Sequence, residues 1–113
     1  MKTADTFIAT IYIGSKERDS SIIHTYQEAR NILQDYCNKI SYCVTLKPIE
    51  FIYKDGNENG FEVGLINYPR FPSNQEEITK RAIEIAEIFK NKFNQYKISV
   101  VCSDKTYMIE QKE

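Results

Sequence analysis

Two short segments of this sequence hold side chains that could bind a ligand. The first contains two cationic groups, at Lys16 and Arg18. The second contains an amide, a phenol, a guanidinium and a phenyl ring, at Asn67, Tyr68, Arg70 and Phe71. Cationic groups bind carboxylates and phosphates, aromatic rings stack on a planar ligand, and an amide hydrogen-bonds to its edge. These residues predict a site for an anionic small molecule, for example a phosphorylated compound or a nucleotide.

The same residues also have ordinary structural interpretations. Lys16 and Arg18 alternate with Glu17 and Asp19, so they could form a solvated loop that neutralises itself. Arg70 could pair with a glutamate at the start of the following helix. Phe71 could pack ahead of that helix as a hydrophobic staple, and Asn67 could cap a strand. Both interpretations stay open on the sequence.

Other catalytic patterns are weak. The three cysteines, Cys37, Cys43 and Cys102, form no C-x-x-C motif, and the sequence places the single histidine, His24, next to none of them. We therefore expect reduced thiols, no metal, no cofactor and no catalytic residues. Glu50 and Glu62 flank one hairpin and could face each other, but nothing in the sequence shows the cleft that acid–base catalysis needs.

Alternation and helical periodicity predict the elements that position these residues. We expect strands at 7–14, 42–53, 61–67, 97–102 and 106–110, and helices at 26–39 and 75–95. The helices begin at two capping boxes, Thr25–Glu28 and Ser73–Glu76. Asp55–Gly56 and Asn59–Gly60 mark a hairpin loop between the second and third strands.

The order of these elements predicts an α+β fold, a ferredoxin-like β-α-β-β-α-β two-layer sandwich with an extra C-terminal edge strand. Pro48 fits this arrangement because it falls in the second strand, at a sheet edge where no ladder donor is needed. We expect the first and third strands to be central and parallel. Both candidate segments, and both helix N-termini, would then meet at one end of the sheet.

Several strands carry large apolar residues on both faces, for example Val63 and Leu65 on one side and Ile66 on the other. Two helices cover only one face, and an exposed apolar sheet is unusual in a monomer. We therefore expect a homo-oligomer, in the simplest case a homodimer, packed through the open sheet face.

Length and charge narrow the class of protein. The chain has 113 residues, enough for a single domain spanning 1–113, and a net charge of −1, which argues against nucleic-acid binding. No apolar run is long enough for a membrane span, and no signal peptide is visible, so we expect a cytoplasmic protein.

The segment from Gly64 to Pro72, together with Glu50–Tyr53, resembles small uncharacterised proteins from phage and mobile-element genomes. The resemblance covers most of the chain and implies an accessory factor, of the kind that binds a host protein or sequesters a nucleotide signal. It assigns no functional residue. The combined expectation is a small non-enzymatic binding module that captures an anionic ligand. The alternatives are a phage-type accessory protein that inhibits a host protein by direct binding, through the hairpin at 54–60, and a small enzyme of unknown reaction.

Overall fold

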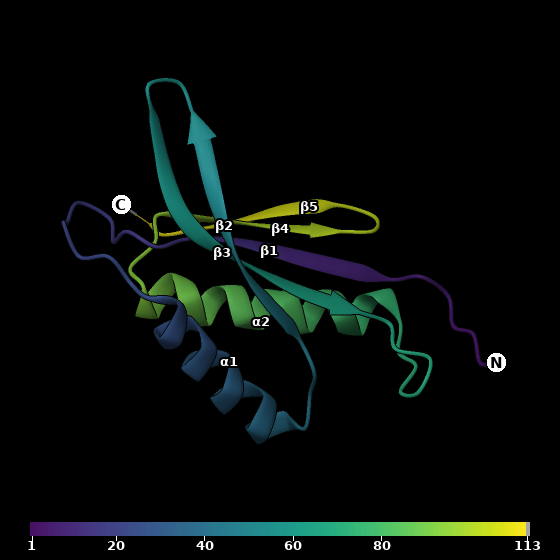
Figure 1. Cartoon of the computed structure of the whole chain (residues 1–113). Helices are drawn as coiled ribbons and strands as arrows, with labels where there is room; N and C mark the ends of the chain where they lie inside the picture. Colours follow the sequence, from purple (N-terminus) through teal and green to yellow (C-terminus); the bar gives the residue numbers. More distant parts are fainter. Residues whose placement is uncertain (113) are drawn as a thin grey trace.

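The computed structural model describes residues 1–112, which form a five-stranded sheet with two helices on one face (Figure 1). The strands and helices, in chain order, are β1 (Ile8–Gly14), α1 (Tyr26–Ile40), β2 (Thr45–Tyr53), β3 (Gly56–Ile66), α2 (Gln75–Lys92), β4 (Lys97–Cys102) and β5 (Thr106–Glu110). This confirms the α+β sandwich with an extra C-terminal edge strand.

The sheet order is β2-β3-β1-β4-β5. Pro48 lies on the edge strand β2, as predicted, and β5 extends the opposite edge beyond β4. Figure 1 shows that β2 and β3 continue past the rest of the sheet as a long hairpin. The turn contains only Lys54 and Asp55, and Asp55 has the left-handed φ of 62°.

Two boundary predictions were wrong at this hairpin. The glycine-rich segment 56–60 is part of β3 instead of a loop, because backbone pairing with β2 continues to Gly56. β2 begins at Thr45 instead of residue 42, after a connection that leaves the end of α1.

The parallel arrangement of the first and third strands was also wrong. β1 pairs with β3 in the antiparallel sense, with Ile8 opposite Ile66 and Gly14 opposite Gly60. The reason is connectivity: the α1 crossover makes β2 run the same way as β1, and the tight hairpin then reverses β3. The end of β1 therefore lies at the start of β3, and the two helices begin at opposite ends of the sheet.

Side-chain hydroxyl and amide groups start both helices. The Thr25 hydroxyl accepts a hydrogen bond from the Glu28 backbone, which confirms the first predicted cap. At α2 the cap is Asn74, whose side chain accepts from the Glu77 backbone, so the predicted capping box at Ser73 is displaced by one residue. Each side chain satisfies a backbone N–H that the helix itself leaves without a partner.

The hydrophobic core lies between the helices and one face of the sheet. Alternate residues of the central strands are fully buried there, including Ile11 and Val63, against α2 residues such as Phe89. Because strand side chains alternate, the residues between them point to the other face, which no helix covers. This open face holds Tyr12 on β1 and Glu62 on β3.

Neither helix in residues 1–112 is long and apolar enough to cross a lipid bilayer.

Candidate functional site

The antiparallel pairing separates the two segments that the sequence predicted to form one site. Lys16 and Arg18 follow the end of β1, whereas residues 67–71 follow the end of β3, beside the start of β1. Seven residues of β1 lie between them, which is roughly 20 Å of strand. The six residues therefore form two groups at opposite ends of the sheet, and they cannot surround one small ligand.

The first group is tied into the loop between β1 and α1. The Lys16 backbone accepts a hydrogen bond from the Gln95 side chain and donates one to the Glu58 carboxylate. The Arg18 guanidinium lies over the Tyr96 ring, with 4.4 Å from Cζ to the ring centroid, and pairs with Asp19 at 3.4 Å. The Arg18–Asp19 pair agrees with one part of the self-neutralising loop that the sequence left open, whereas Glu17 faces His24.

In the second group, Asn67 is buried and both ends of its amide are used inside the protein. Its Nδ2 donates to the backbone oxygen of Asp5 at 2.8 Å, and its Oδ1 accepts from the Ser73 backbone at 2.6 Å. Through these two hydrogen bonds the Asn67 side chain connects the N-terminal segment to the loop ahead of α2. Tyr68 is half-buried, and its hydroxyl lies 3.6 Å from the Cys43 sulfur.

Arg70 and Phe71 are exposed at the tip of this same loop. The Arg70 guanidinium lies over the Phe71 ring, 5.2 Å from its centroid. No described residue forms an ion pair with Arg70, so the pairing with Glu76 or Glu77 that the sequence left open does not occur. These two side chains remain available to a partner, but they line neither of the two concavities on the helical side.

Two concavities lie on the helical side of the molecule. A groove of about 800 Å³ separates α1 from α2, and a smaller hollow of about 270 Å³ lies between α1 and the start of β2. In the groove, the Tyr36 hydroxyl donates to Glu84 at 2.7 Å, and Arg81 pairs with both Glu77 and Glu84. The Tyr36 hydrogen bond, reinforced by Arg81, lowers the pKa of the Glu84 carboxyl. Arg81 and Glu84, which both line the groove, therefore neutralise each other.

The open sheet face carries a group that the sequence analysis missed. Tyr12 on β1 lies directly opposite Glu62 on β3, and both side chains are half-buried. The Glu62 carboxylate pairs with Lys47 on β2 at 3.0 Å. The Glu62 side chain is only 20% exposed, whereas that of Lys47 is 66% exposed, so Lys47 can move away without disturbing the sheet. The apolar side chains of Ile8 and Ile66 lie nearer one end of this face.

Glu62 was considered in the sequence only as a partner of Glu50, and this pairing does not occur. Glu50 lies opposite Asn59 and accepts a hydrogen bond from the Asn57 side chain, on the other face of the hairpin. A better signal was available: Tyr12 and Glu62 each stand between two apolar residues in an alternating strand. Such residues lie on the face of the sheet that points away from the core. On neighbouring central strands they share that face and can be adjacent.

Among residues 1–112, the histidine and cysteine side chains form no cluster that could hold a metal ion. His24 stacks on Phe93, with 4.2 Å between ring centroids, and its two nitrogens face Glu17 and Glu28. Within residues 1–112, no three histidine, cysteine or acidic side chains are grouped closely enough to hold a metal ion.

These features define a class of protein: a small two-layer α+β sandwich whose antiparallel sheet has one covered and one open face. Two solved structures share this architecture. A phage SAM lyase in the apo state superposes with a TM-score of 0.79 at 15% identity, covering 95% of this chain and 90% of the other. A phage SAM lyase in complex with S-methyl-5′-thioadenosine superposes with a TM-score of 0.77 at 13% identity, covering 98% and 94%. No family model matches the chain, and no curated protein matches it in sequence.

This finding corrects the functional expectation from the sequence. We expected a non-enzymatic module that captures a ligand or inhibits a host protein, yet both structural neighbours are enzymes. The third option, a small enzyme, is the one that agrees with them. At these identities the comparison establishes the fold, and the chemistry has to be argued from the residues of this chain.

Proposed function

We propose that this chain is a lyase that cleaves S-adenosylmethionine and releases S-methyl-5′-thioadenosine. The observation that carries the proposal is the fold likeness to phage SAM lyase over 95% and 98% of the chain. The match also covers 90% and 94% of the neighbours' own chains, which leaves little room for an additional domain with a separate catalytic apparatus.

The reaction breaks the bond between the sulfonium sulfur and the γ-carbon of the amino-acid part. The bonding electron pair goes to sulfur, which becomes a neutral thioether. A lyase adds no water, so the γ-carbon receives its new bond from within the substrate. Attack by the substrate's own carboxylate oxygen closes a five-membered lactone and balances atoms and charge without a co-reactant. The protein then needs only to hold the substrate in the folded geometry that brings these two atoms together.

We place the substrate on the open face, at Tyr12 and Glu62. The substrate carries a sulfonium and an ammonium group, which favour an aromatic ring and a carboxylate as neighbours. Glu62 would bind the α-ammonium group in place of Lys47, which leaves the substrate carboxylate free to attack. The Tyr12 ring would lie against the sulfonium, where it favours a cation without donating a hydrogen bond to the carboxylate.

The two concavities on the helical side fit this substrate less well. In the groove between α1 and α2, Glu84 is already held by Tyr36 and Arg81. The hollow beside β2 contains Arg30 and no carboxylate among its lining residues. A guanidinium at that position repels a sulfonium cation.

We also propose that a second copy of the chain covers the open face. Ile8, Ile66 and Met108 are 39%, 46% and 53% exposed on the open side of β1, β3 and β5. A flat sheet face excludes water from a substrate only when something packs over it. A homo-oligomer, in the simplest case a dimer, would bury these side chains and enclose the site.

The deciding experiment incubates the purified protein with S-adenosylmethionine and follows S-methyl-5′-thioadenosine by chromatography. We expect the thioether to accumulate catalytically, with a lactone as the co-product and no oxygen incorporated from labelled water during cleavage. Glu62→Gln should lose this activity and Glu50→Gln, which makes the same chemical change on the other face of the hairpin, should keep it. Absence of turnover in the folded wild-type protein would refute the proposed function.

A further inference from the structure

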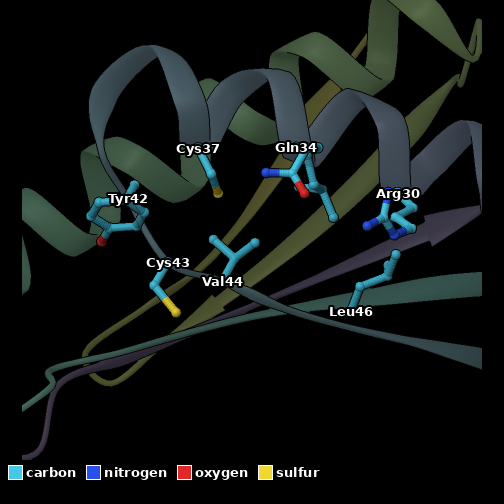
Figure 2. Close-up of a pocket in the computed structure, with 8 residues that line it drawn as sticks. Arg30, Gln34, Cys37, Tyr42, Cys43, Val44 and Leu46 are labelled. Carbon is cyan, nitrogen blue, oxygen red and sulfur yellow. The ribbon is translucent and has the colours of Figure 1, made fainter.

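The hollow between α1 and the start of β2 has features of a binding site that the proposed reaction does not use (Figure 2). Its volume of about 270 Å³ is close to the lower end of small-molecule pockets, roughly 300–1,000 Å³. Figure 2 shows that Arg30, Gln34 and Cys37 project from successive turns of α1, while Val44 and Leu46 come from the strand side.

Arg30 is the charged group of this hollow, and no described residue forms an ion pair with it. The residues three and four positions away on the helix are Tyr26, Gln27, Leu33 and Gln34, none of which is acidic. The residues that line the hollow include no aspartate or glutamate. The hollow is therefore a concave surface with one uncompensated positive charge.

The remaining lining determines what kind of anion would fit. Leu33 is buried, and Val44 and Leu46 are half-buried, so the floor is apolar. The Gln34 amide stands one turn from Arg30 and can hydrogen-bond to a polar atom of a ligand. An apolar floor beside a guanidinium matches a carboxylate attached to a compact apolar or planar body, because the fork of arginine binds both carboxylate oxygens.

We propose that this hollow binds a small organic carboxylate, with Arg30 as its anchor and the apolar floor as the seat of its body. The hollow lies between α1 and the sheet, whereas Tyr12 and Glu62 lie on the opposite face. The proposal therefore stands independently of the lyase reaction, and the two can fail separately.

Two thiols in the lining provide the readout. Cys37 and Cys43 line the hollow, whereas Cys102 is buried on β4 and serves as an internal reference. The probe is benzoate, and its neutral isostere benzamide is the matched control ligand. We expect benzoate to slow the alkylation of Cys37 by N-ethylmaleimide in a saturable way, and benzamide to have no effect at the same concentrations. Peptide mass spectrometry assigns the alkylation rate to each cysteine.

Substitutions distinguish the anchoring role of Arg30 from a general effect of the protein's charge. Arg30→Gln should weaken benzoate protection about tenfold, the effect of losing one charge-assisted hydrogen-bond pair. Arg30→Lys should restore part of it, because it keeps the charge but loses the fork. Lys54→Gln, which removes the same charge at the hairpin turn, should leave protection unchanged. Absence of protection in the wild-type protein, unchanged protection in Arg30→Gln, or equal loss in Lys54→Gln would each overturn the proposal. Cleavage of S-adenosylmethionine should be the same in Arg30→Gln as in the wild-type protein, which tests the independence of the two sites.

Discussion

Tyr12 of β1 lies directly opposite Glu62 of β3 on the face of the sheet that no helix covers. Both residues stand in central strands, so their backbones are fixed by hydrogen bonds on two sides. Because these backbones are already ordered, a ligand that binds Tyr12 and Glu62 has little backbone entropy to remove. This pair is the centre of the proposed lyase site.

Replacing the carboxylate tests its role in substrate binding. Glu62→Gln keeps the shape of the side chain but removes the charge that would hold the substrate ammonium group. We expect kcat/KM for S-adenosylmethionine cleavage to fall by roughly 10- to 100-fold, as for the loss of a charged hydrogen bond. Steady-state kinetics checks this result, with circular dichroism to confirm folding. An unchanged kcat/KM would place the substrate elsewhere.

Replacing the ring separates its π surface from its hydroxyl. Tyr12→Ala removes the aromatic face beside the proposed sulfonium position and should lower kcat/KM by roughly 3- to 30-fold. Tyr12→Phe keeps the face and should retain activity close to that of the wild-type protein. If Tyr12→Phe were as impaired as Tyr12→Ala, the hydroxyl instead of the ring would be the important group.

A charge on the open face should disrupt the proposed oligomer. Ile66→Lys places an ammonium group where a second copy would pack, and burying an unpaired charge is unfavourable. Ile52→Lys makes the same change in the hairpin at a residue that is 80% exposed on the other face. Native mass spectrometry should show multimers for the wild-type protein and Ile52→Lys, and monomers for Ile66→Lys. A monomeric wild-type protein would contradict the covered-face proposal.

The two hydrogen bonds of the Asn67 side chain should contribute to stability. Asn67→Ala removes two hydrogen bonds and leaves the Ser73 N–H and the Asp5 carbonyl with one partner fewer. We expect the free energy of unfolding to fall by about 1–3 kcal/mol in urea titrations. Asn38→Ala, which removes one hydrogen bond on the exposed surface of α1, is the control and should change stability by less than about 0.5 kcal/mol. Equal losses of stability in Asn67→Ala and Asn38→Ala would argue against a special contribution of the Asn67 hydrogen bonds.

The hydrogen bond between Tyr36 and Glu84 should make stability fall at alkaline pH. Burial, reinforced by the bond to Glu84, raises the pKa of the Tyr36 hydroxyl above its usual value. The folded state therefore holds this proton more tightly than the unfolded chain. Its contribution is full below the ordinary tyrosine pKa of about 10 and is lost as pH rises above it.

Tyr36→Phe removes this contribution. The variant should be less stable than the wild-type protein by about 1 kcal/mol near neutral pH, because the hydrogen bond is lost. The difference should shrink as pH rises above about 10, where the wild-type hydroxyl loses its advantage. Urea unfolding at several pH values measures this convergence, and a constant difference at all pH values would show that the hydroxyl does not titrate as proposed.

Local sequence patterns predicted most of the secondary structure correctly. The last two strands were predicted at their observed bounds, and the Thr25 cap and the edge position of Pro48 were also predicted correctly. These features depend on residues close in sequence: alternation, helical spacing, a capping hydroxyl and a proline without an N–H. The hairpin was less accurate, because Gly56 and Gly60 indicate a turn in isolation but are held in β3 by pairing with β2.

The sequence by itself determined the class of fold, since the order of its elements and their apolar faces admit one compact sandwich. It even contained the strand directions, because a crossover followed by a tight hairpin must reverse β3 relative to β1. What only the tertiary structure decided is which side chains meet. The antiparallel register separates Lys16 from Tyr68 and places Tyr12 opposite Glu62, and among residues 1–112 no side chain forms an ion pair with Arg30 beside β2. Such neighbours are far apart in the chain, and their contacts depend on register and packing, which the composition of either segment alone does not encode.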